Sequence, residues 1–190
     1  MDDMLKKINF ILELEKLKAV LRKSKPIGLE RFENSAEHSW HVCMLVMVLA
    51  EDANPKVDVF KVIKMMLLHD IVEIDAGDVL VYDEVAREEA YLKEIEASKR
   101  IFGLLPTHLE EEFINIWNEF EDGITNESKF AKAIDRVIPV LQNINNNGQS
   151  WMENNITLEQ VLNKNVIIKD ANPALWIHIK EKLKDSPFWK

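Results

Sequence analysis

Residues 57–74 read VDVFKVIKMMLLHDIVEI, and apolar residues recur through this segment at the spacing of a helix. The pattern predicts one helix over the whole segment, with an apolar face toward a core. His69 and Asp70 stand at the end of the apolar run 65–68. An ionisable pair at that place is costly to bury unless a partner compensates it, and a divalent cation would do so. A turn of helix that faces solvent is the other interpretation, because a His-Asp dipeptide is common by chance.

The segments on both sides of this one also have helical patterns. Only five glycines and six prolines interrupt the chain, which is few for a protein built from many short strands. Ser35 is expected to cap the helix that follows it. The predicted class is all-α, with no clear strand. The expected helices span 4–22, 35–53, 57–74, 83–102, 109–120, 127–142 with a kink at Pro139, and 173–183, and a capping box of Thr157 and Gln160 begins another.

Length, charge and cysteine content narrow the class of function. The 190 residues suit a single domain, and the formal net charge of −9 argues against binding to a nucleic acid polymer. A small phosphorylated ligand is compatible with this charge, because one or two arginines can hold a single phosphate. The longest apolar run, residues 42–50, is shorter than the roughly 20 residues that cross a membrane. Cys43 is the one cysteine, so we expect a cytoplasmic protein with no membrane contact and no disulfide.

Three more ionisable residues stand where they could join His69 and Asp70. Glu73 follows Asp70 by three residues and so shares its face of the expected helix. His38 opens the helix at 35–53, where a solvated histidine at a capped helix start is the alternative. Asp135 lies in the middle of a helix that otherwise carries packing residues, where a paired structural ion is the alternative.

The order and context of these residues resemble the HD-domain metal-dependent phosphohydrolases. A histidine, a His-Asp pair some thirty residues later and an aspartate about 65 residues further on are the family's pattern. The branch with the bacterial 5'-deoxynucleotidases and their eukaryotic relatives is the most similar. The matching strings are 33–41 (ENSAEHSWH), 68–78 (LHDIVEIDAGD), 102–106 (FGLLP) and 148–151 (GQSW).

This resemblance implies a fold, a metal and a set of ligands. The fold would be a helical bundle in which residues 1–190 form one HD-type domain, with a core at about 17–151 and C-terminal helices at 157–185 packed on it. One divalent transition metal ion, Mn, Co, Ni, Zn or Fe, would be the cofactor. Its ligands by resemblance are His38, His69, Asp70 and Asp135.

The resemblance also assigns roles toward a substrate. Glu73 would act as the acid/base group beside the catalytic Asp70, and Asp78 would accept a hydrogen bond from the 3'-hydroxyl of a nucleotide sugar. Arg31 and Arg22 would hold the phosphate. A departure follows Arg22, because this sequence has Lys23 where the branch tends to carry a bulky aromatic residue.

The predicted function is therefore metal-dependent release of phosphate from a small nucleotide, with a deoxyribonucleoside 5'-monophosphate as the best single substrate. The alternatives are hydrolysis of an alarmone, a cyclic nucleotide or a nucleoside triphosphate, and a non-catalytic binding protein stabilised by its metal. A homodimer is the expected assembly, since five tryptophans exceed what one small core requires. The Glu-rich stretch 84–96 is interpreted as a solvated helix face.

Overall fold

The computed structural model describes residues 2–189, and the prediction of an all-α fold is confirmed for them. The one strand-like pairing within these residues is an isolated antiparallel bridge between Leu21 and Asn34. No described helix is both long enough and apolar enough to cross a bilayer. The 3-10 helices are η1 (Leu14–Ala19), η2 (Ala50–Asp52) and η3 (Pro187–Trp189). The α-helices are α1 (Asp3–Glu13), α2 (Ser35–Leu49), α3 (Val59–Leu68), α4 (Glu73–Ala76), α5 (Glu84–Phe102), α6 (Thr107–Asp122), α7 (Asn126–Asn145), α8 (Gln149–Glu153), α9 (Leu158–Asn165), α10 (Ile168–Ala171) and α11 (Pro173–Asp185).

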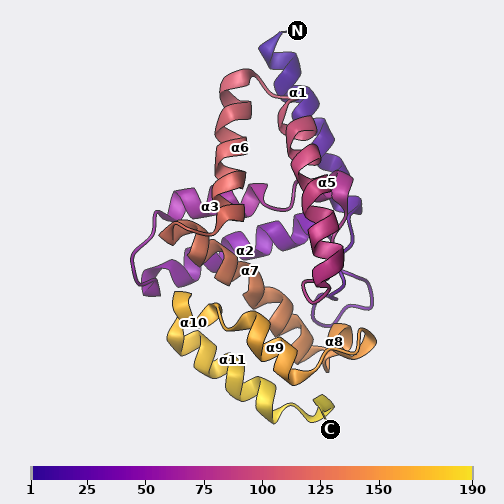
Figure 1. The fold of residues 1–190 in the computed structure, drawn as a ribbon, viewed down its shortest axis with the longest axis vertical. Coiled ribbons are helices and arrows are strands. Elements are labelled where there is room, and N and C mark those ends of the chain that lie inside the picture. The colour runs from indigo at the N-terminus through magenta and orange to yellow at the C-terminus, as the bar shows by residue number, and fades with distance from the viewer. Residues whose placement is uncertain (1, 190) are drawn as a thin grey trace.

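Helix α7 runs through the middle of the molecule and joins its two apolar clusters. Figure 1 shows α1, α5 and α6 at the N-terminal end, α2 and α3 crossing the middle, and α8 to α11 at the C-terminal end. Phe130 and Ile134 of α7 are buried in the cluster shared with α2, α3 and α6. Val137 and Val140 are buried in the second cluster, against α10 and α11. The amphipathic pattern of this segment therefore predicted the central helix correctly.

The helix expected over 57–74 is shorter in the structure. Helix α3 ends at Leu68, and the backbone then tightens into turns in which Ile71 and Glu73 donate to the carbonyls of Leu68 and Asp70, three residues earlier. Helix α4 begins only at Glu73. In such a 3-10 turn, side chains three residues apart eclipse one another, so Asp70 and Glu73 still point to the same side. The expected helix was therefore too long, but the expectation that Asp70 and Glu73 lie on the same side of the backbone holds.

Two more boundaries differ from the expected ones. The helix predicted over 4–22 ends at Glu13, continues as the 3-10 helix η1, and leaves Arg22 in extended backbone, where its amide donates to the Glu33 carbonyl. Helix α2 is capped by Asn34 rather than Ser35. The Asn34 side chain accepts from the Glu37 amide at 2.9 Å, and the Glu37 carboxylate reaches back to complete a capping box. Ser35 is thereby free for a contact inside the protein.

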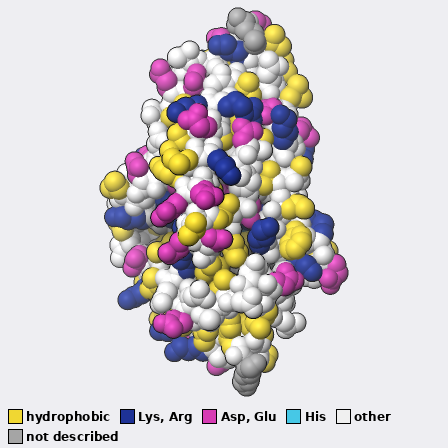
Figure 2. All heavy atoms as spheres, turned by 45° about the vertical axis from the view of Figure 1, so that its right-hand side comes forward, with side chains coloured by type: hydrophobic (Ala, Val, Ile, Leu, Met, Phe, Trp, Pro, Cys, Tyr) yellow, Lys and Arg dark blue, Asp and Glu magenta, His cyan; other side chains and the backbone are white. Residues whose placement is uncertain are grey.

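Charged side chains of both signs cover the surface. Figure 2 shows acidic and basic side chains interspersed over one face, without a continuous patch of either sign. The described residues of this face therefore lack the basic patch that binding to a nucleic acid polymer would require.

We predict that Asn34→Ala lowers the free energy of unfolding by about 1 kcal/mol, because a helix N-cap contributes about that much. Asn34→Asp is the matched control and should keep most of the stability, since a carboxylate accepts the same amide hydrogen bond. Urea denaturation followed by circular dichroism measures both. Equal stability of Asn34→Ala and the wild type would contradict the assignment of the cap.

Candidate metal centre

Three side chains from three parts of the chain meet at one point, and the two histidines among them are buried. His38 comes from the first turns of α2, His69 directly follows α3, and Asp135 lies in the middle of α7. The Oδ1 atom of Asp135 is 2.8 Å from His38 Nε2 and 3.4 Å from His69 Nε2. These three side chains present their ligand atoms within 4.8 Å of one another. The structure thus brings together residues separated by 97 positions in sequence.

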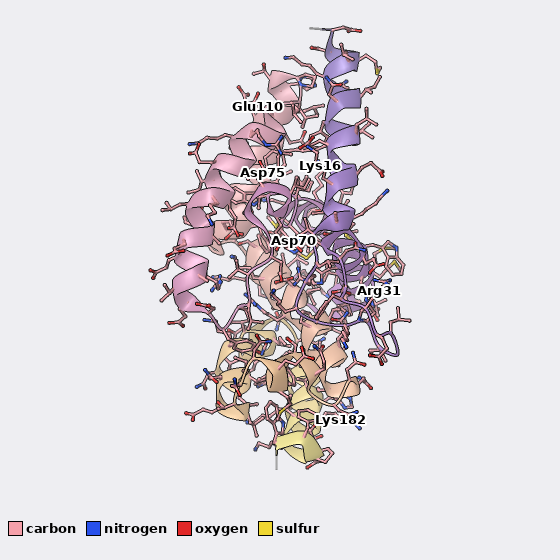
Figure 3. The ribbon with its side chains drawn as sticks, turned by 90° about the vertical axis from the view of Figure 1, so that its right-hand side faces the viewer. Lys16, Arg31, Asp70, Asp75, Glu110 and Lys182 are labelled. Atoms are coloured by element: carbon pink, nitrogen blue, oxygen red, sulfur yellow. The ribbon has the colours of Figure 1, made fainter. Side chains whose placement is uncertain are left out.

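Asp70 completes the group on the side of His69. Its Oδ1 atom is 3.0 Å from His69 Nε2, and its Oδ2 atom is 4.0 Å from His38 Nε2. Figure 3 shows Asp70 in the interior, between the helices. All four ligands predicted by resemblance therefore face one another.

The chemistry of this donor set fits one divalent metal ion. Ligand atoms about 2.1 Å from a common ion, at right angles, lie roughly 3 Å apart, as several of these atoms do. His69 Nε2 is buried and has no hydrogen-bond partner in the described structure. Two imidazole nitrogens with two carboxylates suit a transition metal such as manganese, cobalt, nickel, zinc or iron. Burial alone would raise the pKa of Asp135, but the two histidines beside its carboxylate hold that pKa well below its ordinary value.

Contacts behind the ligands fix which nitrogen of each histidine faces the centre. His69 Nδ1 lies 2.9 Å from the Met66 carbonyl, which can only accept, so the proton is on Nδ1 and Nε2 is left as a ligand atom. His38 Nδ1 faces Glu33, whose Oε2 is 3.5 Å away. Glu33 is itself buried and accepts a 2.6 Å hydrogen bond from Gln142 of α7. Sequence reasoning missed Glu33 and Gln142, because nothing near them in sequence shows that they meet.

Glu73 is buried beside this group and is held by Ser35. The Ser35 hydroxyl donates to Glu73 Oε2 at 2.6 Å. Burial, followed by the negative charge of Asp70, raises the pKa of Glu73 well above its ordinary value. A raised pKa favours the protonated carboxyl, and an acid/base group must be able to hold and exchange a proton. Ser35 was predicted as a helix cap, and its actual contact with Glu73 could not be read from local sequence.

Arg22 links the carboxylates of the site. Its Nη1 atom donates to Asp70 Oδ2 at 2.8 Å and lies 3.8 Å from Asp78 Oδ1. Burial lowers the pKa of Arg22, but the charges of Asp70 and Asp78 outweigh burial and raise that pKa. Burial also raises the pKa of Asp78, against the effect of Arg22. Arg22 and Asp78 therefore lie in the site, as the resemblance implied.

A cavity of about 200 Å³ opens beside these residues. His69, Asp70, Glu73, Asp78 and Asp135 line its acidic end. Helices α5, α7, α8 and α9, Lys23 and the loop after Asp78 form its other walls. These walls carry aromatic, amide, hydroxyl, cationic and acidic side chains: Lys23, Tyr82, Arg87, Tyr91, Glu94, Lys132, Arg136, Asn143, Ser150, Trp151 and Asn165. The space is of the right order for a small organic phosphate.

Two expectations about charged residues near the site differ from the structure. Arg31 does not line the cavity: its two Nη atoms donate to the Glu37 carboxylate at 2.7 and 2.8 Å, and Figure 3 shows it at the outer edge of the molecule. The stretch 84–96 is not wholly solvated, because Arg87, Ala90 and Glu94 on one face of α5 line the cavity. Burial, followed by the nearby Glu121 charge, raises the pKa of Glu94 to about 7.

We predict that Glu33→Gln weakens metal binding about ten- to hundredfold, as loss of a carboxylate behind a histidine ligand commonly does. The variant keeps the size of the side chain and removes the acceptor that faces His38 Nδ1. Competition with a coloured chelator for Mn²⁺ measures the affinity. Glu30→Gln, at a fully exposed carboxylate, is the control. Equal affinity in Glu33→Gln and the control would contradict the role of Glu33.

We predict that Glu94→Gln stabilises the protein relative to the wild type as pH rises from 4.5 to 7. The folded protein holds the Glu94 proton up to about pH 7, whereas the unfolded chain releases it near 4.5, so ionisation of Glu94 lowers the wild-type stability over this interval. Melting temperatures of both proteins across pH 4.5 to 8 measure the difference. Glu96→Gln, at an exposed carboxylate of the same helix, is the control. A difference that does not change with pH would contradict the raised pKa.

Known proteins share both the sequence pattern and the fold. A 5'-deoxynucleotidase HDDC2 from Mus musculus is 32% identical over 115 residues, which are 60% of this chain and 56% of that protein. The protein of the same name from Xenopus laevis is 31% identical over 137 residues, 70% of this chain and 67% of that protein. The match with the mouse protein thus spans little more than half of its length.

A solved structure covers nearly the whole chain. The crystal structure of a predicted metal-dependent phosphohydrolase from Magnetospirillum magnetotacticum superposes with a TM-score of 0.90 at 34% identity. The match covers 97% of this chain and 95% of that one. The family model described as HD domain matches residues 14–176, a range that contains His38, His69, Asp70 and Asp135. This chain therefore belongs to the HD domain family.

Proposed function

We propose that this protein is a metal-dependent phosphohydrolase that releases phosphate from a nucleoside 5'-monophosphate, with deoxyribonucleotides as the preferred substrates. The observation that carries the proposal is the position of Glu73, a buried carboxyl with a raised pKa beside four convergent ligands at the end of a cavity. The names of the mouse and frog relatives support the choice of substrate class.

His38, His69, Asp70 and Asp135 would hold one divalent ion, and manganese, cobalt, nickel, zinc and iron are the candidates. Such an ion, when bound, supplies Lewis-acid chemistry: it offsets charge on phosphoryl oxygens and lowers the pKa of water. The protein's contribution is to hold each imidazole from its Nδ1 side, through the Met66 carbonyl and the Glu33 carboxylate, so that both Nε2 atoms face the centre.

Glu73 moves the proton that the hydrolysis requires. Its Oε2 atom is occupied by the Ser35 hydroxyl, so Oε1 is the oxygen that exchanges a proton with the substrate or water. Glu73 is the acid that would protonate the departing 5'-oxygen. The oxygen of a water molecule bonds to phosphorus as the P–O bond to the 5'-oxygen breaks, so the products are inorganic phosphate and an alcohol that leaves without a full negative charge.

Asp78 and Arg22 are the proposed contacts to the rest of the substrate. Asp78 would accept a hydrogen bond from the sugar 3'-hydroxyl, and Arg22 keeps Asp70 and Asp78 in position through its ion pairs. Lys23 lines the same part of the cavity, and its charge lowers the pKa of Asp78. Substrate binding by Arg31 stays a prediction that requires its guanidinium to leave Glu37.

The assembly and compartment also stay proposals. A homodimer is supported by the exposed apolar side chains of α2, among them Trp40 at 64% and Met47 at 62%. Apolar surface of this kind is often covered by a second subunit. A cytoplasmic location is proposed from the single cysteine and rests on nothing further.

Phosphate release from a panel of deoxyribo- and ribonucleoside monophosphates, with added Mn²⁺ or Co²⁺, tests the function. We expect Asp70→Ala to lose metal and activity together. Glu73→Gln should keep its metal and lose about 10² to 10⁴ in kcat, the usual contribution of a positioned acid/base group. Metal content is measured on the same samples.

Two results would contradict this proposal. Full activity in Glu73→Gln would remove the acid/base role. Absence of release from every monophosphate by the metal-loaded wild type would favour alarmones, cyclic nucleotides or triphosphates, or a non-catalytic binding protein.

A further inference from the structure

Arg136 is a cationic side chain in the cavity without a partner. It follows Asp135 on α7 and lines the cavity wall together with Lys132 and Asn143 of the same helix. Its Nε atom is shielded from solvent and has no hydrogen-bond acceptor within residues 2–189. Shielding a guanidinium N–H from water without an acceptor is costly, so a side chain in this state is prepared for an acceptor from outside the protein.

The other arginines show how unusual this is. Arg22 pairs with Asp70, Arg31 with Glu37, and Arg100 with Asp75 and Glu13. The two arginines for which the described structure has no ion pair are Arg136 and Arg87, and both line the same cavity.

Arg87 lies on α5, across the cavity from α7, and its side chain is exposed where that of Arg136 is half-buried. The two are close enough for the charge of one to act on the other. Like charges that face one space repel each other, and an anion between them would reverse the sign of that interaction. The pair thus defines a cationic subsite that begins inside the cavity and reaches its rim.

The ligand for this subsite follows from what the metal centre lacks. A phosphate dianion at that centre would meet the carboxylates of Asp70 and Asp135, and Arg22 is already engaged by Asp70. Arg136 is the unengaged guanidinium beside Asp135, and its planar set of N–H donors matches phosphoryl oxygens. We infer that Arg136, with Arg87 at the rim, binds the oxygens of the substrate's phosphate. This inference rests on the proposed function and adds to it a cationic holder that lines the cavity.

The experiment measures binding of inorganic phosphate to the metal-loaded protein by isothermal titration calorimetry. Arg136→Gln should raise the Kd for phosphate about ten- to hundredfold, since a hydrogen bond between charged groups contributes that much. Arg136→Lys keeps the charge and should lose less. Arg100→Gln, which removes a paired arginine outside this cavity, is the matched control and should bind as the wild type does.

Kinetics with two substrates identify which group Arg136 contacts. A nucleotide and a simple aryl phosphate share only the phosphate, so Arg136→Gln should raise KM for both by the same factor. A rise for the nucleotide alone, with unchanged binding of inorganic phosphate, would mean contact with the base or sugar and would overturn the inference. Wild-type phosphate affinity in Arg136→Gln would overturn it as well.

Failure of this inference can be told apart from failure of the proposed function. If the wild type hydrolyses no monophosphate but binds inorganic phosphate through Arg136, the subsite stands and the function falls. If the wild type is active and Arg136→Gln is indistinguishable from it, only the subsite falls. Should Arg136→Gln not fold, Arg87→Gln, at an exposed position, decides: we expect about a threefold weaker phosphate affinity, as for a partly screened charge. No change in Arg87→Gln would then overturn the subsite.

Discussion

The hydrogen bond between Asp135 and His38 is the contact on which the site depends. Asp135 is carried by the central helix α7, and His38 by α2, which crosses it. His69, at the end of α3, lies against the same Asp135 carboxylate from a third direction. The Phe120 ring of α6 packs edge-on against the His69 ring, with 5.2 Å between the ring centroids. Both imidazoles are buried, and the Nε2 atoms of both face Asp135. Removal of Asp135 would leave these two polar rings without the carboxylate that compensates them. The contacts that pack α2, α3 and α6 on α7 therefore also align the ligands.

Charged groups of both signs line the cavity. Carboxylates gather at the metal centre, where Arg22 is the single guanidinium that pairs with them within residues 2–189. Unpaired guanidinium groups stand on the walls formed by α5 and α7. A ligand with an anionic end could approach both a metal ion at the centre and these arginines. Such a ligand suits this arrangement of charges better than a neutral molecule does.

Local patterns predicted the helices well where one apolar face decides the structure. The α7 pattern predicted buried Phe130, Ile134 and Val137, and the capping box of Thr157 and Gln160 occurs as expected. Prediction failed where a long-range contact competes with a local one. Ser35 is an acceptable cap by type, yet it donates to Glu73, 38 residues away, and Asn34 caps the helix instead. The α3 pattern likewise could not reveal that the backbone tightens at Leu68.

The same distinction applies to the site. His38, His69, Asp70, Glu73 and Asp78 are identifiable because they lie in local strings that match a family, and Asp135 because of its place in the family's order. Glu33, Gln142 and Arg136 come to the site only through the fold. Arg31 also stands near a motif, but the fold pairs it with Glu37, six residues away, and its contact with a substrate stays a prediction.

Metal occupancy and proton occupancy of this site are linked. Without a cation, burial and the mutual repulsion of the carboxylates raise the pKa values of Glu73 and Asp78, so the site retains protons. A divalent ion offers the compensating charge in another form and would release protons as it binds. The ligands come from α2, the end of α3 and α7, and an unfolded chain does not hold them together. Binding therefore favours the folded state by mass action, and the centre that performs the chemistry also ties the central helices to one another.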